Sequence, residues 1–219
     1  MKAYALFRKD LHSELRTRYA VNSLAMFIIV AISVILFSIG QERINENLTA
    51  GLYWVVIFFS AMSGLARAFV SEEERGTSLT LQLIASPSTV FSGKLIFNLA
   101  LVFAMNTVIS LLYAALFEGF VLQNFVLFLI TFVLGNIGLA VSSTIIAAII
   151  AKAGSKGTLY PVLSFPILLP LILTSVSLTL NSINGTSFED SIFEIAIVAC
   201  YDIIMISTSY MLFDFIWKD

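Results

Sequence analysis

The basic residues of this 219-residue chain fall into a few short clusters, which are separated by long apolar runs. A bilayer has a hydrocarbon core of roughly 30 Å, and a helix needs about 20 residues to cross it. Several of the apolar runs reach that length, which the core of a water-soluble domain does not require. The pattern therefore predicts an all-α integral membrane protein with several spans.

The composition supports the same fold class. Hydrophobic residues make up 59% of the chain and charged residues 12%, whereas soluble domains carry about 25% charged residues. The formal net charge of −2 gives no electrostatic reason to expect nucleic acid as a partner. The single cysteine, Cys200, lies in an apolar run and is expected to be a small buried hydrophobe.

Six spans can be placed, and they leave no room for a separate soluble domain. They are expected at about 21–39, 49–70, 95–117, 124–150, 159–180 and 192–216. Residues 1–219 are thus expected to form one membrane domain. Eleven lysines and arginines fall on one side of these spans and only Arg43 on the other. The positive-inside rule then places both termini in the cytoplasm.

The segment before the first span, within residues 1–20, has apolar residues at a spacing of four. They are Phe7, Leu11, Leu15 and Tyr19, and charged residues surround them. This spacing predicts a helix over residues 3–19 that lies in the membrane interface. A topology signal with incidental amphipathicity is the alternative. The only histidine, His12, is on this segment and is expected to be a solvated surface residue.

The connection between the second and third spans is the most polar stretch of the chain. Its acids are expected in the cytoplasm, and Gly76 is expected to end a helix there. A short segment over residues 77–85 then has apolar residues at helical spacing but is far too short to span, and Ser86 and Pro87 are typical of the start of a new helix. A short amphipathic helix that is joined to two spans can transmit a displacement from a soluble partner to both of them. The residues assigned to that contact are Glu72, Glu73, Glu74, Arg75, Gly76, Leu79, Leu83, Ile84 and Pro87.

Polar and helix-distorting residues also occur inside the spans. A run of small residues in the fourth span predicts close helix packing. Prolines in the fifth span predict a kink or an opening of the helix, where neighbouring helices or water must bond the freed backbone groups. Asp202 is an intramembrane carboxyl that is either protonated, bonded to Ser, Thr or Asn inside the bundle, or paired with another subunit. The candidate polar or hinge positions are Asn98, Asn106, Asn136, Pro166, Pro170 and Asp202.

Motifs for catalysis are missing from the sequence. It contains no GxxxxGK[ST], no HExxH, no GxSxG and no cluster of cysteine and histidine. The chain is therefore not expected to be an enzyme or to bind a metal or cofactor alone. A partner would have to supply the energy for any work.

Two blocks of the sequence carry a combined pattern. Block 133–173 contains the run of small residues, a short turn with basic residues and glycine, and a span with Pro166 and Pro170. Block 51–98 contains Trp54, Ser60, Arg67, Phe69, the acids before Gly76, Leu79, Leu83, Pro87 and Lys94. Both blocks resemble the CcmB family of cytochrome c maturation proteins, the membrane subunits of the haem exporter ABC complex, and in the first block Pro166 and Pro170 match best. The length, the six spans and the short loops agree over the whole chain.

The resemblance implies an ABC-2-like permease subunit in a bacterial cytoplasmic (inner) membrane, with ATP hydrolysed by a cytoplasmic CcmA-like ATPase. CcmC-like and CcmD-like membrane proteins and a CcmE-like haem chaperone are the other implied partners, with two copies of the chain per ATPase dimer. Haem is the implied cargo, either exported or released on its chaperone, and the missing membrane histidine argues against axial ligation by this chain. A generic ABC-2 exporter of lipid, polysaccharide or drug, and a non-transporting assembly scaffold, are the alternatives.

Overall fold

Helices form the secondary structure throughout the described chain. The computed structural model of the protein describes residues 2–40, 44–65, 69, 72, 76–152 and 160–218, and within these ranges it contains no strand. The helices are α1 (Lys2–Thr17), α2 (Tyr19–Ile39), α3 (Glu46–Leu65), α5 (Ser78–Ile84), α6 (Pro87–Leu116), α7 (Phe125–Lys152), α8 (Tyr160–Asn184) and α9 (Ile192–Lys218). The predicted all-α class is confirmed.

Six of these helices are long and apolar enough to cross a membrane, as predicted. The spans are Val21–Ile39, Glu46–Leu65, Pro87–Leu116, Phe125–Lys152, Tyr160–Asn184 and Ile192–Trp217. The third span differs most from its predicted bounds, because α6 begins at Pro87 and not near residue 95. Its 30 residues reach about 45 Å at about 1.5 Å per residue, so α6 extends beyond a hydrocarbon core of roughly 30 Å.

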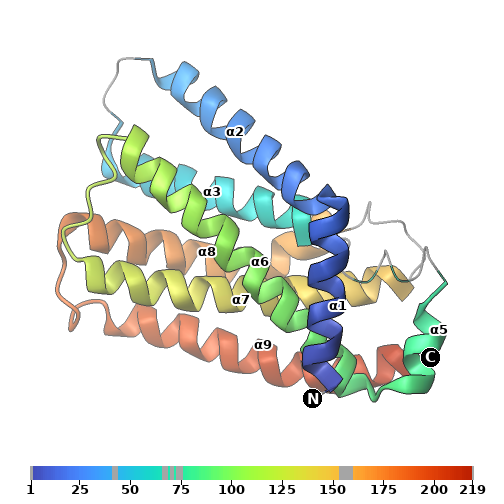
Figure 1. Ribbon diagram of the computed structural model, residues 1–219. Coiled ribbons are helices and arrows are strands. Elements are labelled where there is room, and N and C mark those ends of the chain that lie inside the picture. Colours follow the sequence, from blue (N-terminus) through green and yellow to red (C-terminus); the bar gives the residue numbers. More distant parts are fainter. Residues whose placement is uncertain are drawn as a thin grey trace.

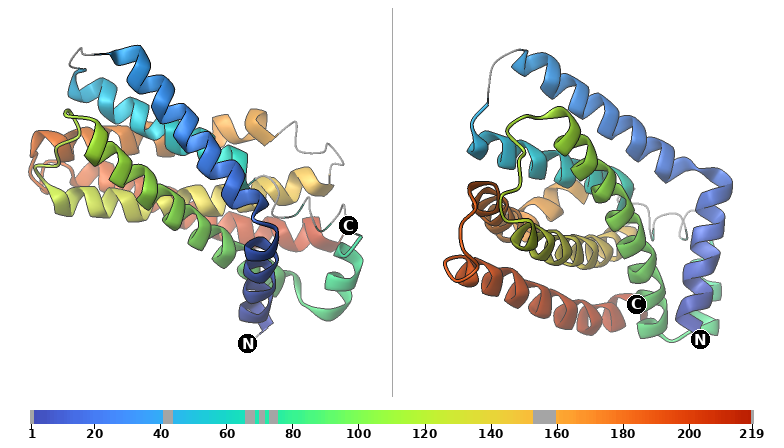
Figure 2. Two further views of the ribbon diagram at one scale, coloured as in Figure 1. Left: turned by 45° about the horizontal axis from the view of Figure 1, so that its top comes forward. Right: turned by 60° about the vertical axis from the view of Figure 1, so that its left-hand side comes forward.

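The bundle is built around α7. This helix packs against α3, α6, α8 and α9, and Figures 1 and 2 show it enclosed among them. Helices in lipid associate by close backbone approach, which small side chains permit. The predicted packing role of the small residues is confirmed, because all of them are buried: Gly135, Gly138, Ala140, Ser142, Ser143, Thr144, Ala147 and Ala148.

The outer helices α2 and α9 turn apolar side chains outward. Phe37 on α2 and Phe215 on α9 are 91% and 70% exposed, and in a bilayer such faces meet lipid, which is as apolar as leucine. Cys200 also lies exposed on α9, so the expectation that it is buried was wrong. It lines a shallow apolar groove with Pro170 and Phe193, where lipid solvates it as well as a protein core would.

The N-terminal segment folds into a helix that is separate from the first span. The predicted helix over 3–19 ends at Thr17 as α1, because Arg18 adopts a left-handed conformation with φ 52°. L-residues rarely adopt this conformation, and here it breaks the helix. Figure 2 shows the resulting sharp bend between α1 and α2. α1 then crosses α6, which it contacts far more than it does α2.

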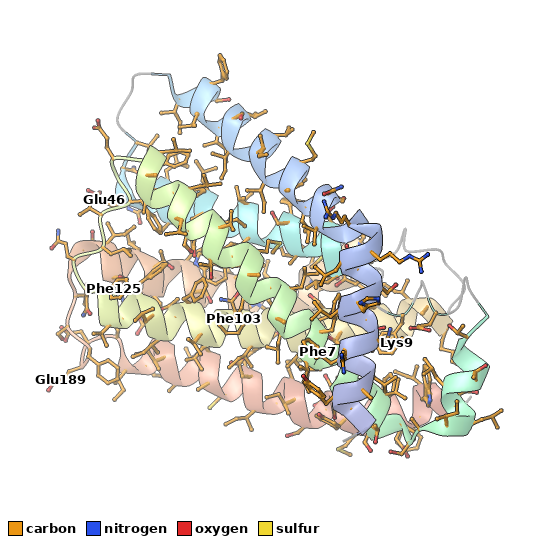
Figure 3. All side chains as sticks on the ribbon, viewed as in Figure 1. Phe7, Lys9, Glu46, Phe103, Phe125 and Glu189 are labelled. Carbon is orange, nitrogen blue, oxygen red and sulfur yellow. The ribbon has the colours of Figure 1, made fainter. Side chains whose placement is uncertain are left out.

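The two ends of the bundle differ in what they carry. Both termini and α5 lie at one end (Figure 1). Glu46 at the start of α3 and Glu189 between α8 and α9 lie at the opposite end from Lys9 on α1 (Figure 3). This arrangement agrees with six spans of alternating direction.

Candidate functional site

The short helix α5 stands at the end of the bundle that carries both termini. Gly76, before it, has a φ of 65°, a left-handed conformation that glycine adopts without strain. One side of α5 is held to the bundle: Leu81 packs against the core, and Gln82 Nε2 donates a 2.7 Å hydrogen bond to the Trp217 carbonyl on α9. The predicted short helix therefore exists, and it is fixed to the last span.

The other side of α5 presents apolar side chains outward. Leu83 is 88% exposed and Ile84 is 64% exposed. They border a groove whose lining is completed by Gln82, Ala85, Ser86, Pro87 and Trp217. Leu79 lies within α5, and its side chain is not among those that the structure describes. Pro87 is the first residue of α6, as predicted, with Ser86 extended before it.

Glu72 was assigned to the contact with a soluble partner, together with Glu73, Glu74 and Arg75. Those three residues lie outside the described residues. Glu72 is only 7% exposed, and its Oε1 accepts hydrogen bonds from Lys9 Nζ at 2.6 Å and Lys94 Nζ at 2.9 Å. The Glu72 carboxylate is therefore bonded within the chain and is not presented at the surface.

Lys9, Asp10, Glu72 and Lys94 form an ion cluster, in which the Lys9 side chain is 47% exposed and the other three side chains are largely buried. Lys94 is 3% exposed, and its Nζ also pairs with Asp10 Oδ2 at 2.9 Å. Burial alone would raise the pKa of Glu72, but Lys94, with hydrogen bonds from Lys9 and Thr77, lowers this pKa to about 2. Two cations and two carboxylates thus balance each other, with Lys9 at the side of the cluster that solvent reaches.

Close contact between α1 and α6 brings the cluster together. A Cβ at Gly93 would lie 2.8 Å from Leu6 Cβ and 3.1 Å from the Ala3 carbonyl oxygen. Only glycine leaves room for α1 at this crossing. Since Asp10 follows Leu6 by one helical turn and Lys94 follows Gly93 directly, the crossing places these two charges side by side.

The predicted intramembrane asparagines are all buried and make hydrogen bonds between or within helices. Asn98 Nδ2 donates to Thr144 Oγ1 at 2.8 Å, which joins α6 to α7. Asn106 Nδ2 donates to Asn136 Oδ1, which joins the same two helices, and Asn136 Nδ2 donates to the Phe132 carbonyl. These bonds serve the packing of α6 on α7.

The prolines of the fifth span lie inside an uninterrupted helix. α8 continues through Pro166 and Pro170, although proline at 170 removes the N–H that would bond the carbonyl of residue 166. Next to this turn, Tyr201 on α9 donates its hydroxyl to the Ile167 carbonyl at 3.1 Å. This bond joins α9 to α8 one residue away from the carbonyl that Pro170 leaves without its helical donor.

Asp202 is 4% exposed and packs against α7. A Cβ at Gly138 would lie 2.6 Å from Asp202 Oδ1. Neither carboxyl oxygen has a hydrogen-bond partner among the described residues, so the predicted bonds to Ser, Thr or Asn are not found there, and its burial leaves no surface for another subunit. A neutral acid fits this environment at lower cost than a carboxylate.

The sequence analysis missed Lys9 and Asp10 as members of a site. Lys94 could have indicated the site from the sequence. It lies within the third span, near its start, and a lysine that is buried there needs an acidic partner. His12, the only histidine of the sequence, is exposed on α1 and lies outside the spans.

Comparison with known proteins identifies the family of the chain. The family model described as CcmB protein matches residues 1–210. No curated protein matches the chain. The match contains five of the spans completely and the sixth, Ile192–Trp217, as far as residue 210, and it contains α5 and the four residues of the ion cluster. The chain belongs to the CcmB family and is a multi-pass membrane component of the haem export system of cytochrome c maturation.

Proposed function

We propose that this chain is the permease-type subunit of an ABC complex and that α5 docks on a CcmA-like cytoplasmic ATPase. ATP hydrolysis in that partner would drive haem export or release of a haem-loaded CcmE-like chaperone. The chain itself would do no chemistry on ATP. CcmC-like and CcmD-like proteins would complete the complex, with two copies of this chain per ATPase dimer.

The exposure of Leu83 and Ile84 is the observation that carries the proposal. They are neighbouring apolar side chains on a helix too short to span, at the end of the bundle. Burying an apolar side chain of this size stabilises a complex by about 1.5 to 3 kcal/mol. Because Gln82 bonds α5 to α9, a partner that binds Leu83 and moves α5 would also displace α9.

The proposal sets the orientation of the protein. The end with α5 and both termini faces the cytoplasm of a bacterial inner membrane, because eleven of the twelve basic residues belong to that side. Haem is the cargo in this scheme. With His12 outside the spans, haem that passed this subunit would have no histidine ligand from it there.

The proposal can be tested by co-expressing the chain with the CcmA-like ATPase of the same organism. Leu83→Asp should lower co-purification of the ATPase at least about tenfold, the equivalent of one lost apolar anchor. Val121→Asp is the matched control, because Val121 is 63% exposed in the connection between α6 and α7. Undiminished co-purification and ATPase stimulation by Leu83→Asp would refute the docking role of α5.

A further inference from the structure

We propose that α1 belongs to the coupling device, with Lys9 and Asp10 as positioning residues that make α5, α1 and α6 move together. The inference rests on the proposed function, because it gives the ion cluster a role in the response to the ATPase. It assigns a task to two residues of α1.

The first step of the path leads from α5 to Glu72. Thr77 directly precedes α5, and its backbone N–H donates to the Glu72 carbonyl at 3.0 Å. The Thr77 hydroxyl also contacts the Glu72 carbonyl, at 3.2 Å, and the Glu72 carboxylate. A displacement of the start of α5 is therefore passed to Glu72 through several hydrogen bonds.

The second step leads from Glu72 to two helices. Lys94 carries the displacement into α6 and Lys9 carries it into α1. Hydrogen bonds between ionised groups are about twice as strong as neutral ones. Pulling Glu72 away would leave Lys94, which is 3% exposed, short of a counter-charge out of water. The cluster therefore favours movement as a unit over separation.

The third step depends on the fit of α1 to α6. The close approach at Gly93 holds Leu6 and Ala3 against α6. A different face of α1 carries the exposed apolar side chains of Tyr4 (65%) and Leu15 (61%), which suit a membrane interface. A shift of the ion cluster would thus move a helix that is also anchored in lipid and that leads into α2 through Arg18.

The double variant Lys9→Met/Asp10→Asn tests the inference. It removes one positive and one negative charge, and it leaves the 2.9 Å pair of Glu72 and Lys94 intact. In the complex with the CcmA-like ATPase, we expect co-purification and melting temperature to stay near wild type. Stimulation of ATP hydrolysis should fall about fivefold, at the low end of typical coupling between sites.

Two outcomes would overturn the inference. One is full ATPase stimulation by a double variant that binds the ATPase. The other is a parallel loss of melting temperature, ATPase binding and stimulation, which would mean that the cluster only stabilises the fold. The conservative variant Lys9→Arg/Asp10→Glu should restore stimulation, and Arg8→Met is the control for loss of an exposed charge on the same helix.

A separate variant addresses the same point without changing charge. Gly93→Ala should displace α1 from α6 and lower stimulation, and unchanged stimulation would contradict the inference even if the double variant failed to accumulate. Leu83→Asp separates the two proposals. If it still binds the ATPase, the docking role fails. If it loses the ATPase while the Lys9 and Asp10 variant keeps full stimulation, only the role of α1 fails.

Discussion

Trp54 occupies the space that any side chain at Gly135 would need. A Cβ at Gly135 would collide with Trp54 Cη2, and Trp54 Nε1 donates a 2.8 Å hydrogen bond to Thr179 Oγ1 on α8. The indole on α3 therefore joins α7 and α8, and a missing side chain makes that contact possible. Both Trp54 and Thr179 are buried.

Gly135→Ala should destabilise the bundle, because the new Cβ would force a buried indole, which is bonded to Thr179, out of its position. Overpacking of this kind costs about 1 to 3 kcal/mol. The matched control is Gly51→Ala on α3, where a new Cβ would meet nothing within 4 Å. There, the better helix propensity of alanine should leave stability equal or raise it by up to about 1 kcal/mol. Thermal unfolding of both variants in detergent would measure the difference, and equal melting temperatures would contradict the packing account.

Asp202→Asn should fold, insert and support c-type cytochrome formation at near wild-type levels. The reason is that the carboxyl has no hydrogen-bond partner among the described residues and packs against Gly138. Asp202→Leu should be at least as stable as wild type, because it removes a polar group from an apolar setting. A folded, inserted Asp202→Asn protein that fails to support cytochrome maturation would show that the ionised carboxylate is needed.

The orientation can be tested with single cysteines placed at the two ends of the bundle. In a Cys200→Ala background, Glu189→Cys should react with a membrane-impermeant maleimide applied to spheroplasts, whereas His12→Cys should react only after lysis. Both positions are exposed, and Glu189 lies at the opposite end of the bundle from Lys9 on α1, the helix that carries His12 (Figure 3). The expectation follows from the positive-inside rule. Labelling of residue 12 from outside, with none at 189, would reverse the topology.

Glu72 should make the stability of the folded protein depend on pH in the acid range. Its pKa is lowered from 4.5 to about 2 in the fold, so its ion pairs with Lys9 and Lys94 stabilise the protein fully above pH 4.5 and are lost as the pH falls toward 2. Above pH 4.5, Glu72→Gln should cost about 3 kcal/mol, because Lys9 and the buried Lys94 then share only the carboxylate of Asp10 in this cluster. The difference in melting temperature between wild type and this variant should shrink with acidification, since a protonated Glu72 resembles glutamine. A difference that does not change with pH would argue against this ion pairing, and Glu189→Gln serves as the exposed control.

Much of the membrane architecture could be predicted from the sequence, because a span is a local property. The length of an apolar run is compared with the thickness of a bilayer, and neither quantity depends on the rest of the fold. The break at Gly76, the short helix that follows and the start of α6 at Pro87 were predictable for the same reason, since glycine and proline act on the backbone where they stand. The family resemblance came from these same segments and agrees with the match over residues 1–210.

What the sequence determined by itself is therefore the all-α class, the six spans and the short helix between the second and third. Only the tertiary structure decided which charges meet. Glu72 pairs with Lys94, 22 residues away, and with Lys9, 63 residues away, and no local pattern links such positions. Lys9 reaches this cluster because α1 crosses α6 at Gly93, which a sequence periodicity cannot show. The same holds for Trp54 and Gly135. The space left by the missing side chain of Gly135 on α7 matters for packing only because the indole of Trp54 on α3 fills it.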